Sequence, residues 1–187
     1  FMEMEVRNPW TVLSKELKYE NPWMRVQENK VLNPAGKDGI YGVVHIKDYA
    51  VAILPLDENN NTWIVGQYRF PFDTFEWEII EGGCPVGTSP LETARRELHE
   101  EAGLIAEHFH LILEMQLSNS KTDEVSYSYI AKGISFTDAE PEETEQLVIR
   151  KLPFEELFKM VMKGEIKDAL SIATVLKAKT LMEQGKL

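Results

Sequence analysis

The sequence predicts a mixed α/β fold, in which a sheet carries helices on both faces and is preceded by a small antiparallel sheet. Three observations predict it. Short strand-like segments bounded by turn residues fill roughly residues 10–80, a strongly patterned helix follows them, and further strands and two helical segments complete the chain. Strands and helices arranged in this order form an α/β or α+β sandwich.

The first part of the chain is a small sheet. Three strand-like stretches open it, at residues 11–19, 23–32 and 40–46. The connection at residues 33–39 is rich in turn residues. A three-stranded sheet of this size has a limited core and is marginal alone, so we expect it to need a partner surface. The predicted division is an N-terminal antiparallel sheet at residues 1–47 and a larger domain at residues 48–187.

The larger part continues in strands and ends in helices. The turn-rich residues 57–61 separate two strands, and a later strand runs into a loop rich in glycine and proline at residues 82–87. Gly164 separates two terminal helical patterns. The predicted elements are strands at residues 49–56, 63–68, 75–80, 109–117, 125–131 and 147–152, and helices at residues 90–102, 154–163 and 169–184.

The helix at residues 90–102 has well-defined ends. Ser89, with Glu92 three residues later, forms a capping box, and Pro90 is at the first helical position. Gly103 can adopt the left-handed conformation that ends a helix. These signals fix both ends independently of the chemistry of the helix.

Three carboxylates lie on one face of this helix. At about 100° per residue, Glu97, Glu100 and Glu101 fall within a narrow arc beside an apolar stripe that faces a core. Like charges at this spacing destabilise a helix by roughly 0.2–0.5 kcal/mol per pair, so the cluster needs a compensating cation. Oxygen ligands in this arrangement suit Mg²⁺ or Mn²⁺. The alternative is an ordinary solvated acidic face.

The composition excludes several classes of protein. The chain has 187 residues, 43% of them hydrophobic and 27% charged, which is ordinary for one globular core. Its net charge of −11 opposes general attraction to nucleic acid or to an anionic membrane. We see no apolar run that could span a bilayer and no secretion signal. Cys84 is the single cysteine, so we expect no intramolecular disulfide and a cytoplasmic protein.

The helix and the loop before it resemble the signature of the Nudix hydrolases, which cleave nucleoside diphosphates linked to another moiety. The matching residues, in identity and spacing, are Gly82, Arg96-Glu97-Leu98, Glu100-Glu101 and Gly103-Leu104. The resemblance implies a Nudix-type α/β/α sandwich. One position departs, because Thr88 stands where the family has a glutamate that braces the loop and the helix arginine. Glu92 is a candidate to replace it.

The resemblance also implies a metal centre. Its predicted ligands for Mg²⁺, with Mn²⁺ as the alternative ion, are Glu97, Glu100, Glu101 and the backbone carbonyl of Glu81. The side chain of Glu81 need not take part. Arg96 and Glu100 are placed among the catalytic residues.

The N-terminal part is similar to one branch of this family, the ADP-ribose and nucleoside diphosphate sugar pyrophosphatases. The similarity covers about residues 10–180, through Trp23-Met24-Arg25-Val26, Asn33-Pro34, Gly36-Lys37, Tyr41, Gln67-Tyr68-Arg69 and Glu78. It implies a homodimer in which the N-terminal sheet crosses to the other subunit and helps to build the substrate site. In some relatives, aromatics at the positions of Trp23 and Tyr41 stack on the base of the substrate. This chain departs from the branch at Ile46, where the compared member has an arginine. The alternative for both aromatics is packing in a core or an interface.

Two charged residues are candidates for substrate binding. The resemblance makes Arg69 a phosphate-binding or substrate-binding residue, since a guanidinium suits diphosphate oxygens. The alternative is a surface ion pair with Asp73 or Glu76. Glu78 ends a strand beside the loop, where it can accept a hydrogen bond from a sugar hydroxyl. Its alternative is a structural pair with an arginine.

The attacking water also needs a group to orient or deprotonate it. In this branch the group lies on a loop after the strands, and residues 133–144 form an acidic, turn-like loop in the corresponding place. Glu143 is the predicted base, with Glu142 and Glu145 as rivals, and Glu145 is the predicted additional metal ligand. The alternative is a solvated acidic loop.

Together these expectations predict metal-dependent hydrolysis of the diphosphate bond in ADP-ribose or a nucleoside diphosphate sugar, giving a nucleoside monophosphate and a sugar phosphate. Two other functions stay open. One is hydrolysis of nucleoside triphosphates or dinucleoside polyphosphates, although compact triphosphatases usually lack the N-terminal sheet. The other is a Nudix-fold sensor that binds a nucleotide without cleaving it, which the three intact helix glutamates disfavour.

Overall fold

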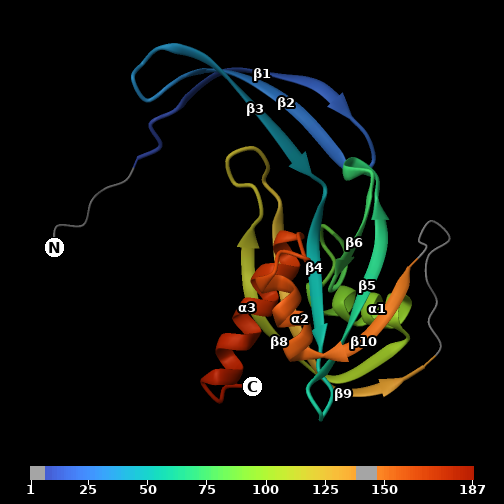
Figure 1. Ribbon diagram of the computed structural model, residues 1–187. Coiled ribbons are helices and arrows are strands. Elements are labelled where there is room, and N and C mark those ends of the chain that lie inside the picture. Colours follow the sequence, from blue (N-terminus) through green and yellow to red (C-terminus); the bar gives the residue numbers. More distant parts are fainter. Residues whose placement is uncertain (1–6, 138–146) are drawn as a thin grey trace. The chain divides into compact units, whose positions relative to one another are not determined.

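A computed structural model describes residues 7–137 and 147–187 of the chain (Figure 1). By its internal contacts the chain divides into two compact units. The first unit comprises the chain up to Lys47 together with Ser118–Glu124, and the second comprises Asp48–Leu117 and Val125–Leu187. No sequence pattern indicates that Ser118–Glu124 belongs with the N-terminal residues.

The first unit is an antiparallel sheet with the strand order β1-β2-β3. Its strands are close to the predicted stretches: β1 (Thr11–Glu20), β2 (Met24–Leu32) and β3 (Asp38–Ile46). An asparagine closes each connection. Asn21 Oδ1 accepts hydrogen bonds from the N–H groups of Trp23 and Met24, and Asn33 Oδ1 does the same for Ala35 and Lys37. Asparagine favours such turns because its side chain bonds to the backbone a few residues on.

This sheet buries little apolar surface of its own. Every residue of β1 is exposed, including Val12, Leu13, Leu17 and Tyr19. Among the described residues of the unit, Val31 is the single buried apolar side chain. An uncovered three-stranded sheet has little independent stability in water.

Ser118–Glu124 is anchored to β3 by Asp123. One carboxylate oxygen of Asp123 accepts a hydrogen bond from the Ile46 N–H (3.0 Å), and the other lies 2.6 Å from Nδ1 of His45. Burial opposes ionisation of this carboxyl, but its hydrogen bonds, with His45 foremost, outweigh burial and lower the pKa of Asp123. His45 therefore helps to hold a turn from a distant part of the chain.

The second unit contains two sheets. The larger has the order β7-β4-β9-β8, in which β4 and β9 are parallel and the other pairs antiparallel, so the predicted mixed sheet is confirmed. The smaller, β10-β5-β6, is antiparallel. The strands are β4 (Asp48–Pro55), β5 (Asn61–Arg69), β6 (Thr74–Glu78), β7 (Ile80–Pro85), β8 (Leu104–Gln116), β9 (Val125–Phe136) and β10 (Val148–Pro153).

Helices pack on both faces of the larger sheet, as predicted (Figure 1). They are α1 (Pro90–Ala102), α2 (Phe154–Met162) and α3 (Ala169–Glu183). Successive residues of β4 point to opposite faces. Ile53 therefore joins a core with Leu98 of α1, whereas Leu54 joins a core with Leu157 of α2 and Val175 of α3.

The segment that leads to α1 differs from the prediction. The predicted strand at residues 75–80 is two strands, because the chain leaves the smaller sheet after Glu78 and enters the larger one at Ile80. The glycine-rich residues expected to form a loop continue β7 instead, and Gly82 is paired with Val51 of β4. Glycine has no side chain that could carry the alternating pattern of a strand, so the sequence indicated a loop.

Two strands are longer than predicted, and one short helix was not predicted. β8 begins at Leu104, directly after α1, and pairs with β9 as far as Phe136. The charged residues Glu107 and Lys132 interrupt the apolar alternation there, which is why the pattern indicated shorter strands. A 3₁₀ helix, η1 (Phe70–Phe72), follows β5.

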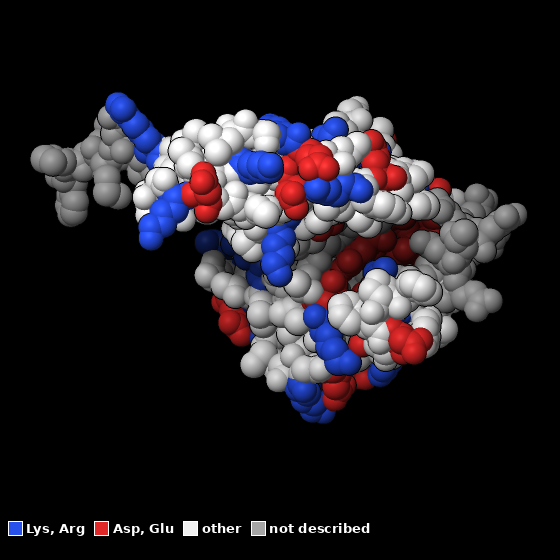
Figure 2. Space-filling view, turned by 90° about the horizontal axis from the view of Figure 1, so that it is seen from above, with Lys and Arg blue, Asp and Glu red and all other residues white. Residues whose placement is uncertain are grey.

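The charged surface is mixed. Figure 2 shows one face, on which the Lys and Arg groups are interspersed with Asp and Glu groups. Within residues 7–137 and 147–187, no helix is long and apolar enough to cross a membrane.

Candidate active site

The predicted ends of α1 are confirmed. The Ser89 hydroxyl accepts a hydrogen bond from the Glu92 N–H (3.5 Å), and Pro90 opens the helix. Gly103 has a φ of 62°, and its N–H donates to the carbonyl of His99 (2.9 Å). The left-handed backbone at this position suits glycine, which is how the sequence located the end of the helix.

Thr88 braces the loop before α1. Its N–H and its hydroxyl both donate to the carbonyl of Pro85, at 2.9 Å and 2.6 Å. Glu92, the candidate replacement for the glutamate that the family has at Thr88, lies 3.9 Å from Nε of Arg95 instead. The loop is therefore held by Thr88 itself, and the partial replacement of that glutamate by Glu92 stays a prediction.

Two of the three helix carboxylates are buried. Glu97 is 7% exposed and Glu101 is 2% exposed, whereas Glu100 is partly exposed. Burial of an ionised carboxylate is unfavourable unless a cation or hydrogen bonds compensate it. An ordinary solvated acidic face therefore does not describe Glu97 and Glu101.

Gly82 provides the space that Glu97 occupies. A Cβ atom at Gly82 would lie 2.0 Å from Cδ of Glu97. Carbon atoms that are not bonded approach to only about 3.5 Å, so no other residue fits without moving the carboxylate. The glycine of the signature thus sets the position of a carboxylate on the neighbouring helix.

Arg96 compensates two carboxylates of this cluster, Glu97 and Glu100. One of its terminal nitrogens donates to Glu100 (2.5 Å), and the other donates to Glu97 (2.5 Å) and to the Gly83 carbonyl (3.2 Å). Burial opposes the charge of the guanidinium, but Glu97 and Glu100 outweigh burial and raise the pKa of Arg96. The arginine also ties α1 to β7.

The chemistry of these donors fits a divalent cation. Carboxylate and carbonyl oxygens are the ligands that Mg²⁺ prefers, and Gly82 leaves room for Glu97 beside the backbone of β7. Within the described part of the chain, no three His, Cys, Asp or Glu side chains converge closely enough to hold an ion. Arg96 bridges Glu97 and Glu100, so a bound cation would share these carboxylates with the arginine.

The side chain of Glu81 is engaged on the other side of β7. The Ser171 hydroxyl donates to Glu81 (3.0 Å), and the same hydroxyl oxygen accepts from the Ile79 N–H (3.0 Å). Burial, together with the carboxylates of Asp168 and Glu78, raises the pKa of Glu81 well above its usual range. The Glu81 side chain therefore belongs to a network at the start of α3, apart from the carbonyl predicted as a metal ligand.

Arg69 and Glu78 form a bidentate pair. Nε of Arg69 donates to Oε1 of Glu78 (2.8 Å), and a terminal nitrogen of Arg69 donates to Oε2. The hydrogen bond that Arg69 donates to Glu78 raises the pKa of Arg69. The alternative reading of Glu78, a pair with an arginine, is therefore the arrangement found. Glu78 is 4% exposed at its side chain, so the guanidinium compensates a buried charge.

The alternative for Arg69, an ion pair with Asp73 or Glu76, is not the arrangement found. Asp73 instead accepts a hydrogen bond from the Tyr68 hydroxyl (2.5 Å), and Glu76 pairs with Lys167 (2.9 Å). Asp73 has a left-handed φ of 54° at the end of η1, which turns its side chain toward Tyr68. Proximity in sequence was therefore a poor guide at this turn.

Arg69 and Glu78 line a pocket of about 750 Å³ between the β5–β6 hairpin and the start of α3. This volume is within the usual range for small-molecule sites. The pocket brings together residues that sequence reasoning missed, namely Phe72, Thr74, Lys167 and Asp168. The available signal was the position of Asp168 directly before a helical pattern, where an acidic residue is a common N-cap.

Trp23 and Tyr41 belong to the first unit. The Trp23 side chain is exposed, next to the turn between β1 and β2. The Tyr41 hydroxyl donates to the Ser120 carbonyl (2.8 Å), and its ring meets Trp10 edge to face, with centroids 5.2 Å apart. Their stacking on a base stays a prediction.

The predicted base lies outside the described residues. Glu143, the predicted base, and its two rivals, Glu142 and Glu145, all fall there. The role of Glu145 as an additional metal ligand likewise stays a prediction.

Two protein families match the chain. The NUDIX domain matches residues 47–174, and the nucleoside diphosphate sugar hydrolase N-terminal domain matches residues 10–44. Among solved structures, a crystal structure described as an ADP compounds hydrolase covers 98% of this chain and 100% of its own, with a TM-score of 0.86. At 19% identity this likeness concerns the fold.

Curated relatives are similar over the same region. An ADP-ribose pyrophosphatase of Mycobacterium tuberculosis is 34% identical over 131 residues, which are 68% of this chain and 63% of that protein. An ADP-ribose pyrophosphatase of Bacillus subtilis is 30% identical over 122 residues, or 64% and 66% of the two chains. A methanol dehydrogenase activator of Bacillus methanolicus is 30% identical over 67% of this chain and 69% of its own. The chain thus spans slightly less than two thirds of the two pyrophosphatases.

Proposed function

The chain belongs to the Nudix family, and from this premise we propose that it hydrolyses the diphosphate bond of ADP-ribose or of a nucleoside diphosphate sugar. The products would be a nucleoside monophosphate and a sugar phosphate. Two similar proteins are named ADP-ribose pyrophosphatases, and the N-terminal match is to a nucleoside diphosphate sugar hydrolase domain. The burial of Glu97 and Glu101 on α1 carries this proposal, because a merely solvated helix would keep such side chains in water.

The reaction needs a divalent cation, which we propose to be Mg²⁺ or Mn²⁺. Glu97, Glu100, Glu101 and the carbonyl of Glu81 would hold it, and Glu145 would add a ligand. Such an ion neutralises phosphate charge and lowers the pKa of bound water. Arg96 bonds Glu97, Glu100 and the Gly83 carbonyl, and so links these two carboxylates to β7.

The chain's own residues would bind and orient the substrate. Arg69 would bind a diphosphate oxygen through Nη1, the terminal nitrogen that does not bond Glu78, and the pair with Glu78 fixes the orientation of the guanidinium. Glu143 would orient or deprotonate the attacking water, and Glu100 and Arg96 would assist at the reacting phosphorus.

We further propose a homodimer that completes the site. The exposed apolar residues of β1 give the first unit a surface that a second copy can cover. In this dimer Trp23 and Tyr41 would stack on the base of the substrate. The uncovered sheet supports this assembly, since it has little core of its own.

A cytoplasmic location completes the proposal. Cys84 is a free, buried cysteine, which suits a reducing compartment. The net charge of −11 and the mixed surface in Figure 2 do not favour nucleic acid or an anionic membrane as a partner.

A substrate panel tests the function. The purified chain is incubated with Mg²⁺ or Mn²⁺ and with ADP-ribose, nucleoside diphosphate sugars, nucleoside triphosphates or dinucleoside polyphosphates, with EDTA as the control. We expect ADP-ribose or a nucleotide sugar to yield a nucleoside monophosphate and a sugar phosphate, and EDTA to stop the reaction. Cleavage of triphosphates alone would refute the proposal, as would binding of nucleotides without cleavage of any.

A further inference from the structure

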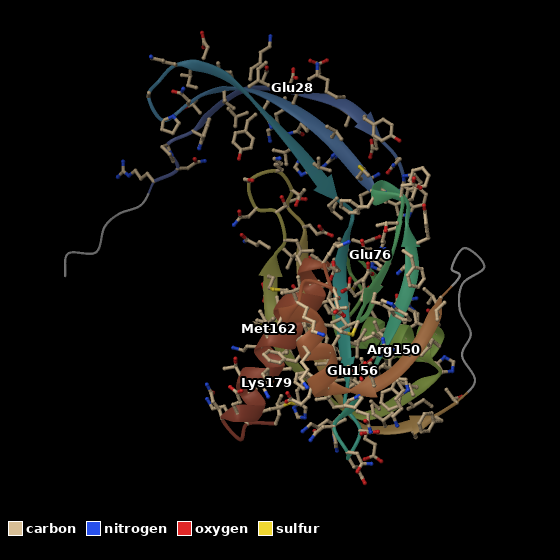
Figure 3. All side chains as sticks on the ribbon, viewed as in Figure 1. Glu28, Glu76, Arg150, Glu156, Met162 and Lys179 are labelled. Carbon is tan, nitrogen blue, oxygen red and sulfur yellow. The ribbon has the colours of Figure 1, made fainter. Side chains whose placement is uncertain are left out.

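Both cations of the pocket beside α3 are already paired with carboxylates. Two cations, Arg69 and Lys167, stand against three carboxylates, Glu76, Glu78 and Asp168, so the lining has a formal charge of 2 − 3 = −1. Arg69 is bonded to Glu78, and Lys167 is bonded to Glu76, which Figure 3 labels on β6. Apart from Nη1 of Arg69, which does not bond Glu78, a phosphate group would meet cations that carboxylates already occupy, and these carboxylates repel it.

A neutral group with many hydroxyls suits these walls better. Each carboxylate oxygen accepts more than one hydrogen bond, so Glu76 can bond Lys167 and also accept from a hydroxyl. The Lys167 ammonium has three donors, and one of them is directed at Glu76. Hydroxyl groups, which both donate and accept, match such alternating acceptors and donors.

Phe72 gives the same pocket an apolar face. Its side chain is 78% exposed, although it lines the pocket. Pro71 stiffens the turn that presents it, and the Asp73 N–H closes that turn on the Phe70 carbonyl (3.3 Å). A rigid aromatic ring beside polar walls can pack against the carbon–hydrogen face of a sugar ring while the hydroxyls reach the walls.

The pocket also lies next to the predicted metal centre. Asp168 lines it and neighbours Glu81, and the next residue along β7 is Gly82, which faces Glu97. β7 is an edge strand of its sheet. The neighbour of the pocket, Glu81, and the neighbour of the helix carboxylates, Gly82, are thus consecutive residues of one edge strand.

We infer that this pocket is the subsite for the sugar of the substrate, with Phe72 as the platform for the sugar ring and Glu76 as an acceptor for its hydroxyls. The inference rests on the proposed function and adds to it the part of the substrate that the pocket receives. It makes Phe72, Glu76 and Lys167 determinants of sugar specificity.

Equilibrium binding tests this assignment. Titration calorimetry in EDTA, which prevents turnover, compares ADP-ribose with ADP, the same nucleoside diphosphate without the sugar. We expect Phe72→Ala to raise the Kd for ADP-ribose about fivefold to tenfold, the order expected for loss of an aromatic contact, and to leave the Kd for ADP unchanged. Phe72→Trp should retain the affinity for ADP-ribose.

Phe70→Ala is the matched control. Phe70 is 92% exposed in the same turn but is not among the described residues that line the pocket, so its loss should change neither Kd. To test the acceptor, Glu76→Gln should raise the Kd for ADP-ribose severalfold and leave the Kd for ADP unchanged. Glu156→Gln, which breaks the pair with Arg150 away from the pocket, should change neither (Figure 3). Thermal unfolding of each variant verifies the fold.

The outcomes separate this inference from the proposed function. Equal losses for ADP and ADP-ribose in Phe72→Ala, or no loss in either, would overturn the sugar subsite even if the wild-type chain hydrolyses ADP-ribose. Wild-type protein that binds ADP-ribose no better than ADP would overturn it as well. A selective loss of ADP-ribose affinity in a chain that cleaves no nucleotide sugar would support the subsite and refute the proposed reaction.

Discussion

Replacing Gly82 by alanine would place a methyl group inside the carboxylate cluster. The added Cβ would lie 2.0 Å from Cδ of Glu97, 2.1 Å from Oε1 and 2.5 Å from Cγ. Contact between carbon atoms begins at about 3.5 Å, so Cδ must move by roughly 3.5 − 2.0 = 1.5 Å. The φ of Gly82 is outside the left-handed region, so the substitution acts through space alone.

Gly82→Ala should reduce both activity and stability. The displaced atoms are the end of a flexible side chain, so we expect the free energy of unfolding to fall by about 1–3 kcal/mol, the usual cost of overpacking. A misplacement of about 1 Å in a catalytic constellation costs roughly a hundredfold, so kcat should fall by about that factor.

Gly83→Ala is the matched control, because its Cβ would meet Oδ2 of Asp48 at 3.7 Å, an ordinary contact. The measurements are urea unfolding and steady-state hydrolysis of ADP-ribose. We expect the stability of Gly83→Ala to stay within about 0.5 kcal/mol of the wild type, with near-normal turnover. Equal turnover in the two variants would refute the idea that Gly82 positions Glu97.

Three further predictions concern the pocket, the acid stability and the assembly. Arg69→Met should lower the free energy of unfolding, measured in urea, more than Glu78→Gln does. The reason is that Arg69→Met leaves the Glu78 carboxylate, which is 4% exposed, without its counter-charge. A larger loss for Glu78→Gln would contradict the buried pair. Burial opposes ionisation of Asp57, but bonds from Lys151 and Asn61 lower its pKa from 3.8 to about 2. The shift contributes about 2 kcal/mol to the free energy of unfolding, which is complete above pH 4 and is lost as the pH falls through 2. The stability of Asp57→Asn should therefore fall less steeply in acid than that of the wild type. An unchanged dependence of stability on pH would exclude this contribution of Asp57. Light scattering at micromolar concentration should give a dimer, and Leu17→Glu on β1 should shift it to a monomer; a fully active wild-type monomer would remove the reason for placing Trp23 in a shared site.

The sequence predicted well those features that depend on neighbouring residues. Ser89, Pro90 and Gly103 each act on the backbone within one helical turn, so both ends of α1 were predicted correctly. The spacing of Glu97 and Glu101 likewise places them on one face of a helix whatever it packs against.

The pocket could not be predicted in the same way. Lys167 and Glu76 are separated by 91 residues, and Ser171 and Glu81 by 90. Such pairs depend on the tertiary packing of β6 and β7 against α3, and no local sequence pattern predicts that packing. The burial of Glu97 was also hidden, since it follows from the packing of Gly82 against α1.

Turnover by Glu101→Gln tests the central claim, a reaction at the carboxylates of α1, most directly. Glu101 is 2% exposed, and the amide keeps its shape while removing the charge that would hold a cation. The variant is purified, shown to be folded by thermal unfolding, and assayed with ADP-ribose at saturating Mg²⁺. We predict that most of the turnover is lost while the fold persists. Normal turnover by the folded, metal-saturated variant would contradict the claim.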